Sequence, residues 1–173
     1  MRTLLAGPLL RRVDAHRACV WLATSEPVTT RVTVFRVVGG TPQPVGEGEG
    51  SAVRIGQRLW VHLVQARPTG GGWPTDELLA YDVSLRAAGD ADGRGLAALG
   101  LLDGDRRIAY RGLPLPTFVV RERLPDLNAL HGSCRLFHGL GEDAFRAADA
   151  EMARHAHLLY RRPSVMFLTG DQI

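Results

Sequence analysis

Short runs of β-branched and aromatic residues, separated by clusters of turn-forming residues, dominate the first part of the chain. These runs predict strands at residues 18–24, 30–38, 59–65 and 78–85, with an imperfect two-residue alternation of polar and apolar positions at residues 31–36. The glycine-rich and proline-containing run at residues 68–74 predicts a loop. Several short strands between turns predict a small antiparallel β-sandwich, of fibronectin- or immunoglobulin-like type, about 100 residues long.

The strand pattern ends before the last third of the chain. Residues 89–104 are rich in Gly, Asp and Ala, and residues 96–102 within them predict one or two helical turns. Pro114 and Pro116 mark a linker, because each proline restricts the preceding residue to extended conformations. We therefore expect two domains, a β-sandwich at residues 1–122 and the start of an α/β domain at residues 123–173.

The pattern of the last fifty residues predicts a strand, a helix and a second strand. Apolar runs open the segments at residues 127–135 and 164–173. Between them, apolar and small residues recur every three or four positions from 144 to 155, which predicts a helix. Asp143 is a plausible start for this helix, and Pro163 follows its end.

Two residues that carry chemistry end the two predicted strands. Cys134 follows Gly132-Ser133 at the end of the first strand, and Asp171 follows Gly170 at the end of the second. Parallel neighbours joined by a helix bring their carboxyl ends to one edge of the sheet, about 4.8 Å apart. Open α/β sheets bind ligands at that edge, so we expect Cys134 and Asp171 to lie close together there.

Composition and charge narrow the class of protein. The 173 residues are 45% hydrophobic and 23% charged, as in ordinary globular proteins. All 21 basic residues are Arg, which we interpret as a codon bias; they are scattered, and the net charge of +3 is small, so we expect no nucleic-acid partner. No stretch approaches the roughly 18 apolar residues of a membrane span. Because the two cysteines are far apart in the sequence, we expect no disulfide. The apolar run at the start is too short and broken for a signal peptide, so we expect a cytoplasmic location.

Each candidate residue has a plainer interpretation beside the functional one. Cys134 in a tight turn beside an Arg suits a nucleophile or metal ligand, but a free Cys is often a buried structural thiol. Asp171 is placed to bridge two cations, or is an ordinary turn or helix-capping residue. Arg135 could bind a phosphate with two hydrogen bonds in a catalytic role, or form a salt bridge.

The histidines are weaker candidates. His131 and His138 flank the Gly-Ser-Cys turn, where either could hydrogen-bond a ligand or simply belong to a loop. His155 and His157 lie two apart on the predicted helix and so diverge. We expect both of these to be surface residues.

The motifs resemble those of a known family. His-Gly-Ser-Cys-Arg at residues 131–135, followed after a helix by Phe-Leu-Thr-Gly-Asp-Gln-Ile at residues 167–173, resembles the alkaline phosphatase D (PhoD-like) family of calcineurin-like metallophosphatases. Residues 7–13 and 19–24 resemble that family's N-terminal β-sandwich, and residues 113–118 its linker. The resemblance implies hydrolysis of phosphate mono- or diesters at a dinuclear metal centre. By position, Cys134 would ligate a ferric iron and Asp171 would bridge it to a second cation, often calcium.

The same resemblance implies that the chain is incomplete. The family pattern continues past Gly-Asp-Gln-Ile with a Tyr and acidic residues, and takes Asn and His ligands from later strands. We therefore expect an N-terminal fragment that is inactive alone and whose last strand is unpaired. Two alternatives stay open: a non-enzymatic β-sandwich binding module with a vestigial tail, and a cysteine nucleophile at Cys134.

Overall fold

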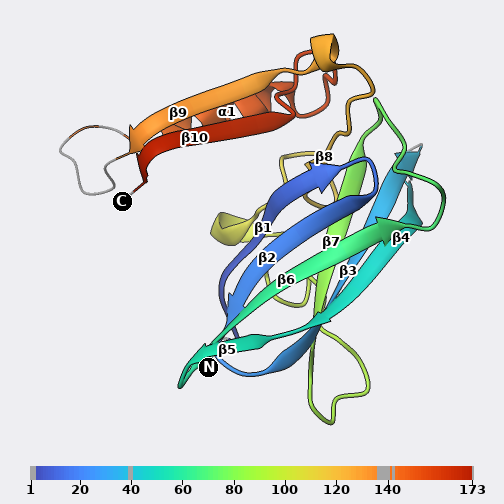
Figure 1. Cartoon of the computed structure of the whole chain (residues 1–173), viewed down its shortest axis with the longest axis vertical. Coiled ribbons are helices and arrows are strands. Elements are labelled where there is room, and N and C mark those ends of the chain that lie inside the picture. The colour runs from blue at the N-terminus through green and yellow to red at the C-terminus, as the bar shows by residue number, and fades with distance from the viewer. Residues whose placement is uncertain (1–2, 39–40, 136–140, 142, 173) are drawn as a thin grey trace. The chain divides into compact units, whose positions relative to one another are not determined.

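The chain folds into two compact units (Figure 1). The structure is a computed structural model that describes residues 3–38, 41–135, 141 and 143–172; the side chains of residues 38, 171 and 172 lie outside the description. The first unit comprises residues 1–74 and 78–120, and the second comprises residues 75–77 and 121–173. The sequence placed the division between residues 122 and 123 and assigned residues 75–77 to the sandwich.

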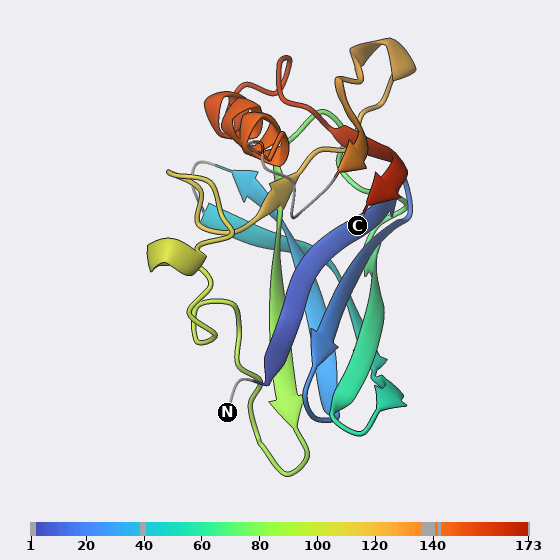
Figure 2. The same cartoon turned by 90° about the vertical axis from the view of Figure 1, so that its left-hand side faces the viewer.

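The first unit is an antiparallel β structure. Its strands are β1 (Leu4–Asp14), β2 (Arg17–Thr24), β3 (Val28–Val38), β4 (Thr41–Ser51), β5 (Val53–Gly56), β6 (Leu59–Pro68), β7 (Leu79–Ala87) and β8 (Thr117–Phe118), and a 3₁₀ turn covers Gly104–Arg106. The strand order is β1-β2-β6-β4-β3-β7-β8, and β5 pairs with β6. The sheet curls so that β1, β2, β5 and β6 form one layer and β3, β4, β7 and β8 the other, consistent with a β-sandwich (Figures 1 and 2).

Apolar side chains from both layers fill the interior of the sandwich. The buried cluster includes Val20, Leu22, Val32, Val64 and Val83, each at most 2% exposed. Alternate residues of β2, β3, β6 and β7 face this core, as the two-residue period of a strand requires. Burial of such side chains stabilises the unit by about 1.5–3 kcal/mol each.

A buried histidine lies among these apolar side chains. His62 is fully buried between the hydroxyls of Thr24 and Thr30. The Thr24 hydroxyl donates to the Glu26 carbonyl at 2.7 Å, so it accepts from His62 Nε2–H at 3.0 Å. His62 Nδ1 then accepts from the Thr30 hydroxyl at 2.9 Å, which fixes a neutral tautomer. Burial lowers the pKa of this imidazole, because the charged form would lose its water.

Four strands, β1, β4, β5 and β8, and one turn differ from the sequence predictions. The structure has a strand at β1, where the sequence indicated only a broken apolar run, and a strand at β4, where it indicated the end of the preceding one. The β1 pairing contains several register shifts, which obscure its period in sequence. Residues 96–102 form hydrogen-bonded turns, and the structure assigns no helix to them.

The second unit contains two parallel strands joined by a helix. Its elements are a 3₁₀ turn (Leu124–Asp126), β9 (Ala129–Arg135), α1 (Phe145–His155) and β10 (Val165–Gln172). Parallel pairing aligns Val165 with Ala129 and Thr169 with Ser133, so the strand–helix–strand order and pairing match the sequence pattern. In the described part of the chain, no helix combines the length and apolar character needed to cross a membrane.

Candidate functional site

The carboxyl ends of β9 and β10 pack tightly against each other. Cys134 has a φ of 51° and Gly170 a φ of 71°, so both strands leave the extended conformation at the same level. A Cβ atom on Gly170 would lie 2.7 Å from Cys134 Sγ and 2.7 Å from Ser133 Oγ. Only glycine fits this approach, because the added atom would overlap two side chains and the φ angle disfavours L side chains.

This packing places the main chain before Asp171 next to the thiol. Asp171 directly follows Gly170 in β10, while its side chain lies outside the described residues. The register of β9 and β10 therefore brings the two predicted ligand positions to one end of the two-stranded sheet. Their joint role as metal ligands stays a prediction.

The Cys134 thiol is accessible. Cys134 is exposed and belongs to no disulfide, so the interpretation of Cys134 as a buried structural thiol is wrong. Its Sγ lies 3.2 Å from the Ser133 hydroxyl, which can donate a hydrogen bond to the sulfur. The left-handed backbone at Cys134 is uncommon for a non-glycine residue, and such strained positions occur often at functional sites. Cys19, by contrast, is buried in the sandwich.

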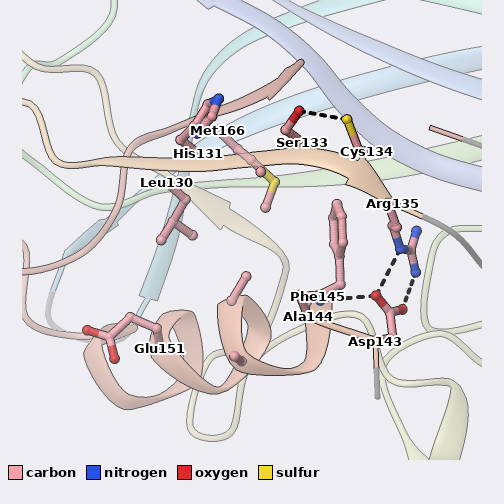
Figure 3. Close-up of a pocket in the computed structure, with 13 residues that line it drawn as sticks. Leu130, His131, Ser133, Cys134, Arg135, Asp143, Ala144, Phe145, Glu151 and Met166 are labelled. Carbon is pink, nitrogen blue, oxygen red and sulfur yellow. Dashed lines mark hydrogen bonds and ion pairs between the residues drawn. The ribbon is translucent and has the colours of Figure 1, made fainter. Parts of the chain in front are cut away.

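Arg135 points to the opposite side of β9, toward α1 (Figure 3). Its Nε donates to Asp143 Oδ1 at 2.9 Å, and its Nη2 contacts Asp143 Oδ2 as the second arm of a fork. The guanidinium also stacks on the Phe145 ring, 4.1 Å from the centroid. The structure therefore places the side chain in a salt bridge, and a catalytic, phosphate-binding role for Arg135 stays a prediction.

Asp143 joins this fork to the start of the helix. Its Oδ1 also accepts the backbone N–H of Phe145 at 3.1 Å, which satisfies a donor in the first turn of α1. The Arg135 hydrogen bond, the Phe145 N–H and the nearby positive charges lower the pKa of the Asp143 carboxyl. The sequence indicated Asp143 as the helix start, but nothing in its spacing indicated the pairing with Arg135.

A cavity of about 490 Å³ lies between β9 and α1. Leu130, Gly132, Phe145, Ala148 and Met166 supply much of its apolar lining, and Figure 3 shows the side chains around it. Glu151 and the Arg135–Asp143 fork supply its charged groups. The thiol of Cys134 points away from α1 in Figure 3, but Ser133 and Cys134 are also among the residues that line the cavity.

The histidines differ in their surroundings. His131 Nε2 forms a hydrogen bond with the Thr169 hydroxyl at 2.8 Å, which links the side chains of β9 and β10 near Cys134. His157 is exposed, as predicted, but the prediction of a surface position for His155 is wrong. His155 is 8% exposed and its Nε2 lies 3.0 Å from Glu151 Oε1, one helical turn earlier. His138 lies outside the described residues.

Few side chains that could bind a metal ion lie together in the described part of the chain. Among the residues that the structure describes, no group of three or more His, Cys, Asp or Glu side chains could hold a metal ion. Cys134 contributes a thiol at the end of β9, and the Asp171 carboxylate cannot be counted because its side chain is not described. The sequence did not indicate that the Ser133 hydroxyl contacts the Cys134 thiol or that the Thr169 hydroxyl contacts His131. The contact between His131 and Thr169 depends on the register of β10 against β9, which the sequence pattern does not give.

Comparison with known protein families gives a match at the N-terminal end of the chain. Residues 1–43 match the model of a family described as a domain of unknown function, DUF7800. The matched segment covers β1, β2, β3 and the first residues of β4. No curated protein matches the chain. The chain is therefore similar to DUF7800 over three strands of its sandwich, and the match does not reach β9 or β10.

Proposed function

We propose that the chain is the N-terminal portion of a PhoD-like metal-dependent phosphatase or phosphodiesterase that hydrolyses phosphate esters. The observation that carries the proposal is the packing of Gly170 against Cys134 and Ser133 at the ends of parallel β9 and β10. That packing supports the resemblance of the two motifs, because it brings together the two positions at which a shared metal site would need ligands. The strand–helix–strand order after a β-sandwich supports it as well.

The donor types suit the metals that the resemblance implies. A thiolate from Cys134 would hold a ferric ion, and a carboxylate from Asp171 would bridge it to a hard cation such as calcium. The exposure of Cys134 and the glycine at position 170 leave the thiol accessible to an ion. When bound, two metals would polarise the phosphate ester and lower the pKa of a bound water.

The proposal also requires polypeptide outside the present chain. Two ligands do not complete a dinuclear centre, so the remaining ligands must come from further strands or from a second polypeptide. Met166, Phe167 and Leu168 of β10 are each more than a third exposed, which suits a strand that would gain a neighbour. We therefore expect the isolated chain to be inactive. A phosphate-binding role for Arg135 would further require that Asp143 release the guanidinium.

One observation favours a second candidate function, a non-enzymatic binding module. The sandwich has its own buried core, and the DUF7800 match lies entirely within it. In this alternative the second unit is vestigial. A purified chain that binds iron stoichiometrically would contradict the vestigial role.

The test of the proposal begins with the reading frame after Ile173. We expect the locus, or a second reading frame, to encode a Tyr and acidic residues followed by Asn and His ligands. The complete protein should hydrolyse p-nitrophenyl phosphate or bis(p-nitrophenyl) phosphate, and Cys134→Ala should abolish this activity. Cys19→Ala is the matched control, since it removes a buried thiol far from β9 in sequence. A stop codon directly after Ile173, with no second frame to supply the ligands, would contradict the proposal.

A further inference from the structure

The outer face of the β1-β2-β6 layer carries a patch of apolar side chains. The strand register places Leu9 beside Trp21 and Trp21 beside Leu63, and places Val61 beside Val53 of β5. Residues paired in this way have neighbouring side chains on one face of a sheet. We call these five residues the outer apolar patch.

The outer apolar patch is open to solvent. Leu9 is 49%, Leu63 56% and Val53 66% exposed, while Trp21 and Val61 are half-buried between them. The residues of the opposite parity, such as Val20 and Val64, fill the core, so the patch is not needed to complete the interior. Contiguous exposed apolar groups of this kind commonly mark an interaction surface.

The charge around the patch is positive on balance. The strands β1, β2 and β6 contain the arginines Arg11, Arg12, Arg17 and Arg67, with Asp14 as their single carboxylate. Arg54 of β5 pairs with Trp60 on the opposite face from Val53, so it does not belong to this border. Asp14 contacts Arg17 at 2.7 Å and Arg12 at 3.5 Å, and Glu47 of β4 pairs across from Arg67. Four arginines against the carboxylates of Asp14 and Glu47 leave the border of the patch with a net positive charge, which complements an anionic partner.

The shape of the patch favours a lipid surface over a protein as that partner. Apart from the Trp21 indole N–H, the five side chains offer apolar contact and no hydrogen-bonding group. The backbone of β2 and β6 beneath them is hydrogen-bonded on both sides, and that of β1 and β5 is paired on one side. Protein interfaces usually add about one hydrogen bond per 100–200 Å². A bilayer instead accepts an apolar surface of any outline, takes up a Trp at the headgroup level, and attracts bordering arginines when its lipids are anionic.

We propose that the outer apolar patch docks the sandwich reversibly on the surface of a membrane that contains anionic lipid. This proposal concerns the first unit and is independent of a metal site in the second. The side chains of Leu9, Leu63 and Val53 enter the headgroup region, and the arginines of β1, β2 and β6 contact lipid phosphates. Binding therefore depends on both apolar contact and charge.

The test is co-sedimentation of the full chain with phosphatidylcholine vesicles with and without phosphatidylglycerol. We expect binding to the anionic vesicles that weakens as ionic strength rises. Leu63→Glu should weaken it by more than about tenfold, and Arg12→Glu by at least about fivefold. Leu124→Glu is the matched control, because it changes an exposed leucine of the second unit in the same way. Circular dichroism checks that each variant is folded.

Three results would overturn the proposal. The first is a folded chain that ignores anionic vesicles, and the second is a folded Leu63→Glu variant that binds as the wild type does. The third is a concentration-dependent dimer that Leu63→Glu abolishes while lipid binding is absent, which would assign the patch to a second copy of the chain.

Discussion

Gly170→Ala tests the close packing at the ends of β9 and β10. The new Cβ would lie 2.7 Å from both Cys134 Sγ and Ser133 Oγ, closer than van der Waals contact allows. The φ of 71° adds about 1–2 kcal/mol of backbone strain for a non-glycine residue. Overpacking typically adds about 1–3 kcal/mol more, so we expect the pairing of β9 with β10 to lose about 2–5 kcal/mol in total.

Hydrogen exchange measured by mass spectrometry is the suitable assay. Trp21, Trp60 and Trp73 all lie in the first unit, so tryptophan fluorescence would not report on β9 and β10. A loss of 2 kcal/mol corresponds to about thirtyfold faster exchange of the amides in the two strands. Alkylation of Cys134 should change as well, because its sulfur must move away from the new methyl group.

Gly132→Ala is the matched control on the same two-stranded sheet. Its Cβ would meet Leu168 Cδ2 at 3.6 Å, an ordinary contact, and its φ is not in the left-handed region. We expect this variant to be neutral or up to about 1 kcal/mol more stable, because alanine restricts the unfolded chain. Equal exchange rates in the two variants would refute the packing described for Gly170.

Three further outcomes follow from the structure. Burial lowers the pKa of His62, so the unfolded state takes up a proton before the folded state does as the pH falls below about 6.5. The free energy of unfolding should then decline by at most about 1.4 kcal/mol per pH unit. Denaturant unfolding at successive pH values should show a smaller decline for His62→Gln. Asp143→Ala should reduce the circular dichroism of α1 more than Asp143→Asn, which keeps an acceptor for the Phe145 N–H; equal losses would contradict the capping role. A disulfide reagent should modify Cys134 quickly and Cys19 only on unfolding, with Cys134→Ser removing the fast phase; rapid modification of both thiols would refute the difference in burial.

The sequence pattern alone predicted those strands whose apolar residues recur at every second position. The strands predicted at residues 18–24 and 59–65 correspond to β2 and β6, because their alternate residues are apolar and face the core. β4 is different, since its glycines serve a close crossing of another strand. A Cβ on Gly46 would lie 2.3 Å from the Arg67 carbonyl oxygen, and one on Gly48 2.1 Å from that of Gln65. These close approaches depend on the tertiary structure, and the sequence pattern therefore did not predict β4 as a strand.

The sequence predicted the strand order and parallel pairing at the candidate site, but not the directions in which its side chains point. The helix between two apolar runs predicted that Cys134 and Gly170 would end neighbouring parallel strands, and the register brings these ends together. The sides of β9 were not predictable, because the left-handed backbone at Cys134 interrupts the alternation of the strand. As a result the Ser133 hydroxyl and the Cys134 thiol, adjacent in sequence, lie on the same side of β9, 3.2 Å apart (Figure 3). The burial of His155 depends on packing that helical periodicity alone did not reveal.

The iron content of the complete protein tests the central claim most directly. The polypeptide encoded by the whole reading frame should be purified as the wild type, as Cys134→Ala and as Cys19→Ala, and its metals measured by mass spectrometry. We predict stoichiometric iron in the wild type and in Cys19→Ala, and loss of that iron in Cys134→Ala. Iron that is absent from the wild type, or retained in Cys134→Ala, would contradict the assignment of Cys134 as a metal ligand.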